Sequence, residues 1–331
     1  MTRFDLWSRY VAHTKRPIFI GPWREEIGSE VIYHLPFVAQ WCHKYNITAD
    51  RLVAISRGGA SFWYGAGKAI ELYDYWPPAD IRLETLKSSQ RHGTVKPQVI
   101  SDLEYALYQT LSARLGIRRF HVLHPSEMYR QLARWNADDM SLAEVMSHLR
   151  FTQIPTPHIP LSVVLPEAYT CVRFYQRHTW PFTEEIKDYC TQIVAELAKH
   201  TPVVVIGSSL HHDDHLDLSF EGPNITNLMD AFPVRENLAL QSAIIARSRA
   251  FVGTYGGTMQ LAVRLGKPSV GFYLEFKGTS YGHKSLTEWL AMKQQLPIFI
   301  GTPQQADLVR SVVSVPLELP QPAGSSSGVM G

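Results

Sequence analysis

Residues 250–273 read AFVGTYGGTMQLAVRLGKPSVGFY, and the order of residue types in this stretch is the clearest guide to the architecture. The apolar run 250–254 predicts a buried strand, and Gly256 and Gly257 predict a tight turn. A short helix is expected over 258–265, because Gly266 and Pro268 are typical helix stop signals. A second apolar run, 269–273, predicts the next strand. Strand, helix and strand in this order are typical of a parallel sheet.

The neighbouring segments extend this pattern through the second half of the chain. The sequence PVVVIG at 202–207 is an almost continuous apolar run, as expected for a strand buried on both faces. A further strand is predicted at 170–175, with helices at 184–200 and 235–247.

The first half alternates in the same way. Short apolar runs predict strands at 17–20, 51–56 and 119–123, and a helix is expected at 126–135. Between the first two strands, five apolar residues recur at helical spacing and would lie on one face of a helix. They are Ile27, Val31, Leu35, Val38 and Cys42. Pro36 falls inside this helix and is expected to kink it or to loosen one hydrogen bond.

The domain boundary is predicted near mid-chain. Four prolines fall between residues 153 and 166, and proline favours extended backbone over helix. A chain of 331 residues is also long enough for two domains. We therefore expect an N-terminal domain over 1–160 and a C-terminal domain over 161–319. The segment 320–331 has few apolar groups and is expected to be a loose tail.

The composition excludes several classes of protein. Hydrophobic residues make up 45% of the chain and charged residues 19%, unlike a disordered, collagenous or coiled-coil protein. The net charge of +2 gives no global case for a nucleic-acid partner. The three cysteines, Cys42, Cys171 and Cys190, form no disulfide or zinc pattern and fit the cytoplasm. No apolar run reaches the roughly 20 residues of a membrane span, so any membrane contact would be peripheral.

The glycine turn at 256–257 is a candidate phosphate-binding site. Glycine allows an anion to approach the backbone closely, and a helix N-terminus offers free N–H groups and a partial positive charge. Thr254 and Thr258 add hydroxyl donors. The alternative is a plain turn that binds nothing, since the segment has neither a GxGxxG nor a P-loop pattern.

The same stretch resembles the nucleotide-sugar half of the heptosyltransferases, which are glycosyltransferases of the GT-B fold. In that family a strand is followed by a helix that starts G-[PS]-M-H-L-A and then by Gly-x-Pro. The matching residues here are Gly257, Thr258, Met259, Leu261, Ala262, Gly266 and Pro268. This chain differs at Gln260, where the family commonly has histidine, and at Thr254 and Tyr255, where it commonly has Asn-Asp or Thr-Asp. The resemblance implies two Rossmann-like domains that face each other across a cleft.

A second match, in the first half, concerns the catalytic base. After its first strand the family has Gly-Asp, two apolar residues, two variable residues and Leu-Pro. Aligning Leu35 and Pro36 with this motif places Glu30 at the catalytic Asp. A carboxylate can take the proton that an acceptor hydroxyl loses. Glu26 and Glu25 are rivals in the same loop, and the alternative is that all three only complement a helix dipole.

Further polar residues are candidates for binding the donor. Arg173 and Arg177 could clamp a diphosphate, although surface ion pairing would explain them equally well. Ser208 and Ser209 follow the strand at 202–207, where open α/β sheets bind ligands. Glu236 could bond ribose hydroxyls or could simply cap a helix. The predicted donor site also contains Thr254, Tyr255, Gly256, Gly257, Thr258, Met259 and Gln260.

The sequence HHDDH at 211–215 suggests a metal site. However, adjacent residues rarely converge on one ion, and no helical spacing of metal ligands is present. A solvated loop is expected there, and no metal is predicted.

Together these features predict a hexosyl- or heptosyl-type glycosyltransferase, which moves a sugar from a nucleotide-sugar donor to a hydroxyl of a glycan or lipid-linked acceptor. By resemblance, the reaction inverts the anomeric centre, needs neither metal nor cofactor, and takes place in the cytoplasm or at the inner face of the membrane. Three alternatives stay open: an epimerase acting on the donor alone, a metal-dependent hydrolase using HHDDH, and an inactive nucleotide-sugar-binding protein.

Overall fold

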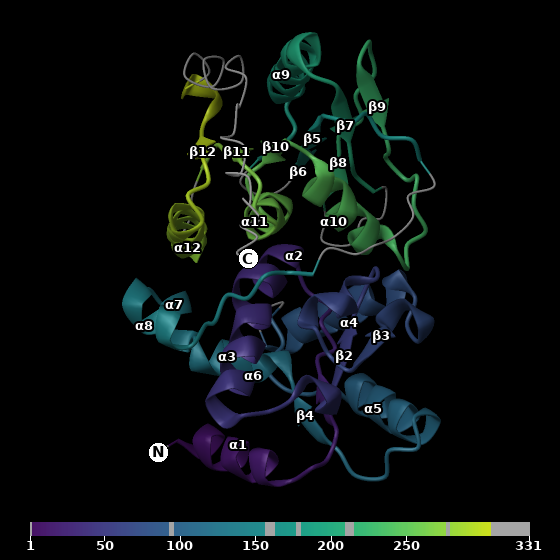
Figure 1. The fold of residues 1–331 in the computed structure, drawn as a ribbon, viewed down its shortest axis with the longest axis vertical. Coiled ribbons are helices and arrows are strands. Elements are labelled where there is room, and N and C mark those ends of the chain that lie inside the picture. Colours follow the sequence, from purple (N-terminus) through teal and green to yellow (C-terminus); the bar gives the residue numbers. More distant parts are fainter. Residues whose placement is uncertain are drawn as a thin grey trace, which may run out of the picture.

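The computed structural model describes residues 2–92, 96–155, 163–176, 180–208, 215–275 and 279–305. These residues form two parallel β-sheets, one in each half of the chain, with helices packed around them (Figure 1). The α/β architecture expected from the sequence is confirmed. The predicted tail at 320–331 and residues 156–162 of the predicted proline-rich boundary lie outside the described residues.

The first sheet is built from short apolar strands. Its order is β3 (Lys68–Glu71), β2 (Leu52–Ser56), β1 (Ile18–Ile20) and β4 (His121–Leu123). Both faces of β1 are buried, because Ile18 and Ile20 pack in one apolar cluster and Phe19 packs in another. Helices α1 (Arg3–His13) and α3 (Leu35–Tyr45) contribute to the first cluster, and α4 (Pro78–His92) and α5 (Asp102–Arg114) contribute to the second.

The second sheet has six parallel strands. Their order is β12 (Ile298–Gly301), β11 (Ser269–Phe272), β10 (Ala250–Thr254), β5 (Thr170–Arg173), β7 (Val203–Val205) and β9 (Ile225–Asn227). Neighbouring residues of one strand again face opposite clusters, as Phe251 and Val252 do. Helix α9 (Glu184–His200) covers one face, and α10 (Asn237–Arg247), α11 (Gly257–Arg264) and α12 (Thr279–Lys293) pack on the other. Burial on both faces explains the continuous apolar runs in the sequence.

Short elements complete the fold. An antiparallel pair of strands, β6 (Tyr175–Gln176) and β8 (Leu216–Asp217), follows the carboxyl end of β5. The remaining helices are α6 (Pro125–Gln131), α7 (Ala133–Asn136) and α8 (Leu142–Ser147), with turns η2 (Ala49–Arg51), η3 (Ala60–Tyr64), η4 (Leu72–Asp74) and η5 (Pro303–Gln305). Within the described parts of the chain, no helix is both long and apolar enough to cross a membrane.

The helix predicted after β1 is interrupted at its centre. It consists of α2 (Ile27–Ser29), a π-helical segment η1 (Glu30–His34) and α3. Leu35 donates its backbone N–H to Glu30, five residues back, and Pro36 has no N–H to donate. The loosened hydrogen bonding predicted around Pro36 is therefore present as a π turn.

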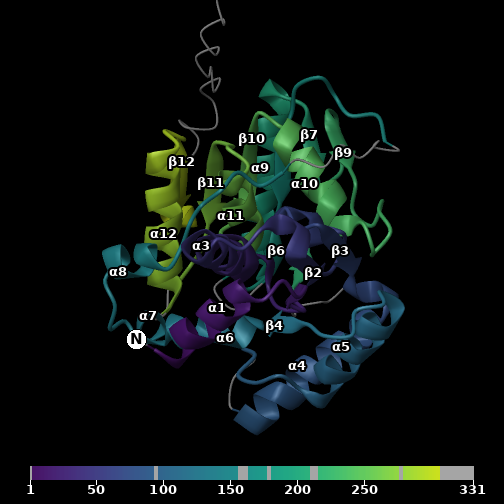
Figure 2. The ribbon, with the colours of Figure 1, turned by 60° about the horizontal axis from the view of Figure 1, so that its bottom comes forward.

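The two halves touch where α2 meets α11 (Figure 1). In the turned view, α3, which continues the same helix, lies beside α11 (Figure 2). A Cβ added to Gly257 would lie 2.6 Å from the backbone nitrogen of Gly28, so α2 and α11 approach at a distance that only glycine permits. Arg264 also crosses between the halves and donates to the backbone oxygen of Thr152 at 2.9 Å. The halves therefore share packed contacts beside the site described next.

Candidate active site

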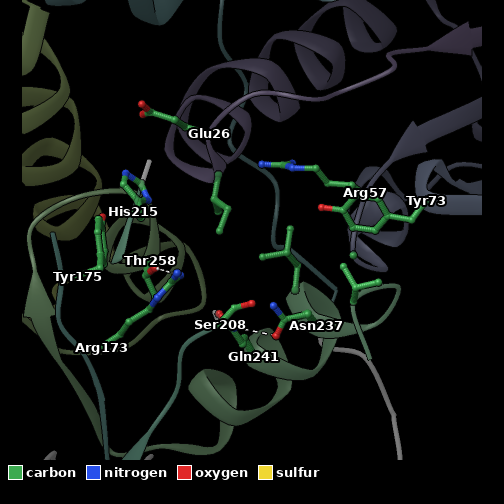
Figure 3. A pocket seen from close by; sticks show the side chains of 15 residues that line it. Glu26, Arg57, Tyr73, Arg173, Tyr175, Ser208, His215, Asn237, Gln241 and Thr258 are labelled. Atoms are coloured by element: carbon green, nitrogen blue, oxygen red, sulfur yellow. Dashed lines mark hydrogen bonds between the residues drawn. The ribbon is translucent and has the colours of Figure 1, made fainter. Parts of the chain in front are cut away.

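A pocket lies between the two halves of the chain (Figure 3). It encloses roughly 720 Å³, open solvent at its mouth included. The described residues that line it are Glu26, Ile27, Arg57, Gly58, Tyr73, Arg173, Tyr175, Ser208, His215, Val234, Asn237, Leu238, Gln241, Gly257 and Thr258. Because both sheets point their carboxyl ends toward it, the pocket occupies the place where open α/β sheets bind ligands.

The N-terminus of α11 forms part of the pocket wall. Strand β10 ends at Thr254, and the helix begins at Gly257 after Gly256 at the N-cap position. Among the described residues, no side chain caps this end of the helix. Gly257 and Thr258 line the pocket, so the first N–H groups of the helix and its positive dipole end lie beside the cavity. This arrangement suits an anion such as a phosphate.

Arg173, at the carboxyl end of β5, lies beside that helix end. Its guanidinium donates to Thr258 Oγ1 at 2.9 Å and to both oxygens of Asp217, at 2.9 and 3.0 Å. The backbone N–H of Ser208 also donates to Asp217, at 2.9 Å. One buried carboxylate therefore fixes two residues of the wall, Arg173 and Ser208.

Helix α10 supplies the neutral polar part of the wall. Gln241 donates to Asn237 Oδ1 at 2.8 Å and to the backbone oxygen of Gly207 at 3.3 Å, which ties the helix to the loop after β7. Both side chains line the pocket next to Ser208 (Figure 3). Their amide groups can both donate and accept hydrogen bonds, as recognition of a base or ribose requires.

The opposite wall comes from the first half of the chain. Arg57 follows β2 and lines the pocket together with Gly58, Tyr73 and Glu26. Its guanidinium donates to Glu30 Oε2 at 3.2 Å and to the backbone oxygen of Glu25. The pocket thus has an arginine on each side, one from each half of the chain.

Glu30, the base predicted from the sequence, lies behind this wall. It is fully buried, accepts from Ser56 at 2.7 Å and Tyr64 at 2.9 Å, and pairs with Arg57. Burial raises the pKa of Glu30 above its ordinary value, although the adjacent Arg57 acts in the opposite direction. Glu30 does not line the pocket, so its observed contacts make it a support for Arg57.

Glu26, the second predicted catalytic residue, does line the pocket. It is half-buried at the N-terminus of α2. It is the one carboxylate among the described residues of the pocket wall. In Figure 3 the Glu26 carboxylate lies on the same side of the view as His215.

The remaining predicted donor residues divide into three groups. Arg173, Ser208, Gly257 and Thr258 line the pocket. Glu236, Thr254, Tyr255, Gly256, Met259 and Gln260 do not appear in its wall. Arg177 and Ser209 lie outside the described residues.

Local contacts explain why several of these predicted residues are not exposed to the pocket. The Thr254 hydroxyl accepts from the backbone nitrogen of Tyr175 at 3.0 Å and donates to its oxygen at 3.1 Å, so it joins two strand ends. Met259 is fully buried, and Gln260 packs against Gly28 where the halves touch. Glu236 is exposed at the start of α10.

The alternative of a metal site depends on the sequence HHDDH at 211–215. Residues 211–214 of this sequence lie outside the described part of the chain. His215 is described and lines the pocket. Among the residues that the structure describes, no three His, Cys, Asp or Glu side chains are grouped so that they could hold a metal ion.

Comparisons with known proteins find similarity among solved structures. No protein-family model and no curated protein matches the sequence. Among solved structures, E. coli heptosyltransferase WaaC with ADP is 13% identical, with 90% of this chain and 100% of that chain covered and a TM-score of 0.43. E. coli ADP-heptose lps heptosyltransferase II is 11% identical, with 90% and 98% covered and a TM-score of 0.42. A glycosyl transferase family 9 protein from Veillonella parvula is 9% identical, with 91% and 90% covered and a TM-score of 0.46. The solved structures to which the chain is similar thus include heptosyltransferases and another glycosyltransferase.

Proposed function

We propose that the chain is a glycosyltransferase that transfers a sugar from a nucleotide-sugar donor to a hydroxyl of a glycan or lipid-linked acceptor. The observation that carries this proposal is the pocket itself. On one side the N-terminus of α11 and Arg173 offer a site for a diphosphate, and on the other side Arg57 and Glu26 face the same space. A diphosphate site facing a carboxylate can both stabilise the leaving diphosphate and take the proton of an acceptor hydroxyl.

The donor would lie along the carboxyl ends of the second sheet. Its diphosphate would rest against the N–H groups of Gly257 and Thr258, with Arg173 alongside. Asn237, Gln241 and Ser208 are placed to bind the nucleoside, because they form the polar wall beyond the end of β7. The helix dipole and the guanidinium group would stabilise the charge of the leaving diphosphate, so the proposed reaction uses neither a metal nor a cofactor.

The acceptor would enter from the side of the first half. Its hydroxyl oxygen would bond to the anomeric carbon while the bond from that carbon to the diphosphate breaks. The hydroxyl proton would pass to Glu26, and the nucleoside diphosphate would leave with the bonding electrons. The described pocket wall has one carboxylate, which suits a base in a single displacement, and a single displacement inverts the anomeric centre.

Ligand binding tests the proposal first. A ligand that binds only the folded chain raises its melting temperature, so ADP, GDP, UDP, CDP and TDP and their common sugar conjugates would be compared by thermal shift. We expect at least one diphosphate and its sugar conjugate to stabilise the wild type, and Arg173→Lys to reduce that shift. Lys187→Ala, on the exposed face of α9, is the control. The absence of a shift with every compound would contradict the proposal.

Product analysis then separates the alternatives. The stabilising sugar conjugate would be incubated alone, with a chelator, and with candidate acceptors. Transfer that survives the chelator supports the proposal. An epimer formed without acceptor would indicate the epimerase, loss of activity with chelator would indicate a metal-dependent hydrolase, and binding without any turnover would indicate an inactive binding protein.

A further inference from the structure

Glu71 holds three backbone N–H groups with one carboxylate. Its Oε1 accepts from Gly58 and from Tyr73, each at 3.0 Å, and its Oε2 accepts from Gly59 at 2.6 Å. Gly58 and Tyr73 line the pocket, whereas Glu71 does not. Glu71 can therefore influence the pocket only through the residues to which it is hydrogen-bonded.

The sequence explains how this contact forms. Glu71 ends β3, and in the parallel ladder it stands opposite Ser56, the last residue of β2. The chain then turns through Gly58 and Gly59, whose φ angles are +61° and +79°. Successive residues with positive φ can turn their N–H groups to one side, and such a concave group of N–H donors binds an anion. In this protein the anion is the side chain of Glu71.

The turn that Glu71 holds also joins the two halves of the chain. The backbone oxygen of Gly58 accepts from the N–H of Ala239 in α10 at 3.0 Å. A Cβ on Gly59 would lie 2.8 Å from the Cβ of Ala239, so the turn fits closely against that helix. Arg57, which lines the pocket, immediately precedes the turn. One carboxylate thus bonds to Gly58, Gly59 and Tyr73, directly beside Arg57 and the contact with α10.

We infer that Glu71 is a positioning residue for sugar transfer, holding Arg57 and Tyr73 against the sugar-facing side of the pocket. The inference rests on the proposed function, because that proposal puts the diphosphate on the opposite wall and leaves this wall to the acceptor and to the sugar that is transferred to it. A second set of bonds fixes the same segment independently of Glu71. Ser61 Oγ accepts from the N–H of Ser56 at 2.9 Å and donates to the oxygen of Ile70 at 2.5 Å. Replacing Glu71 should therefore disturb the pocket wall without unfolding the segment.

The test compares two ligands of the full-length protein. The probes are the nucleoside diphosphate that stabilises the wild type most, and its sugar conjugate, both titrated calorimetrically. We expect Glu71→Gln to weaken binding of the sugar conjugate roughly tenfold, as loss of a hydrogen bond to a charged group would. Binding of the diphosphate alone should change less than about threefold, because it contacts the opposite wall.

Glu144→Gln is the matched control. Glu144 accepts from the backbone N–H of Ser141 at 2.8 Å at the start of α8, which is not part of the pocket wall. This variant loses a similar carboxylate–backbone bond, so it should change neither affinity. An equal loss of both affinities in Glu71→Gln would mean that Glu71 has only a structural role and would overturn the inference.

A double-mutant cycle with Arg57→Lys shows whether Glu71 acts through Arg57. If it does, the double variant loses less binding free energy for the sugar conjugate than the two single variants lose in sum. Additive losses, or wild-type affinity in Glu71→Gln, would overturn the inference while leaving the proposed function intact. If Glu71→Gln does not fold, Glu71→Asp takes its place in the same comparison. A wild type that binds none of the probes contradicts the proposed function instead.

Discussion

Arg173 and Asp217 form a two-pronged ion pair beneath the candidate diphosphate site, with Nε to Oδ1 at 2.9 Å and Nη2 to Oδ2 at 3.0 Å. The pair leaves Nη1 of Arg173 to donate to Thr258 at the start of α11. Asp217 thus determines which way the guanidinium faces. Because the pair is almost fully buried, its loss should affect ligand binding more than the loss of an exposed pair would.

Asp217→Asn should weaken nucleoside diphosphate binding about tenfold, because an amide nitrogen would then face the guanidinium donors. Calorimetric titration of the best-binding diphosphate measures the change. The matched control is Asp139→Asn, which breaks the exposed pair with Arg134 and should leave affinity unchanged. Equal affinities in wild type and Asp217→Asn would show that Arg173 does not depend on this partner.

Glu26→Gln should lower transfer at least a hundredfold while diphosphate affinity stays near that of the wild type, since general-base catalysis contributes about 10²–10⁴-fold. Glu30→Gln should keep more activity, because Glu30 is buried behind Arg57. Transfer rates with the acceptor found in the product screen measure both variants. The reverse ranking would make Glu30 the base that the sequence motif predicted.

Gly257→Ala should lower the free energy of unfolding by about 1–3 kcal/mol, as overpacking of a tight contact does. Its Cβ would lie 2.6 Å from the backbone nitrogen of Gly28, which cannot move alone. The loss of stability in Gly28→Ala should be smaller when Gln260 is also replaced by alanine, because the Gln260 side-chain oxygen is the atom nearest to the added Cβ. Urea unfolding compares the variants, and a Gly257→Ala protein as stable as wild type would exclude the close contact.

The pH dependence of the free energy of unfolding should reflect the protonation of His34. Its ring packs against Trp23 at 4.7 Å, and burial lowers the pKa of His34 from 6.5 to about 3. The unfolded chain therefore takes up a proton below about pH 6.5 that the folded chain does not, and stability falls as pH falls. Between pH 7 and pH 5, wild type should lose about 2 kcal/mol more than His34→Gln. Equal losses in urea unfolding at the two pH values would contradict a buried, neutral His34.

The fold could be predicted from the sequence where strands are buried on both faces. Strands β5, β7, β10 and β11 are buried at every position and lie in predominantly apolar runs of sequence, so their positions were evident. Strand β3 escaped prediction because it is a partly exposed edge strand with the short sequence KAIE. Helix α5 escaped because its apolar residues are spread around the helix, although the capping box formed by Ser101 and Glu104 marks its start.

The site could be predicted only in part, for a physical reason. Residues next to a strand end or a glycine turn, such as Arg173 and Gly257, are marked by local sequence. Arg57 follows β2 just as Ser208 follows β7, so the same rule could have found it. Asn237 and Gln241 reach the pocket, and Asp217 reaches Arg173, through tertiary packing, which no local pattern records.

The central claim is that the donor diphosphate binds at the N-terminus of α11. A crystal structure with the best-binding nucleoside diphosphate tests it directly. We predict phosphate oxygens within hydrogen-bond distance of the backbone nitrogens of Gly257 and Thr258, with the nucleoside beside Asn237 and Gln241. Density for the diphosphate elsewhere, with only solvent at this helix end, would contradict the account.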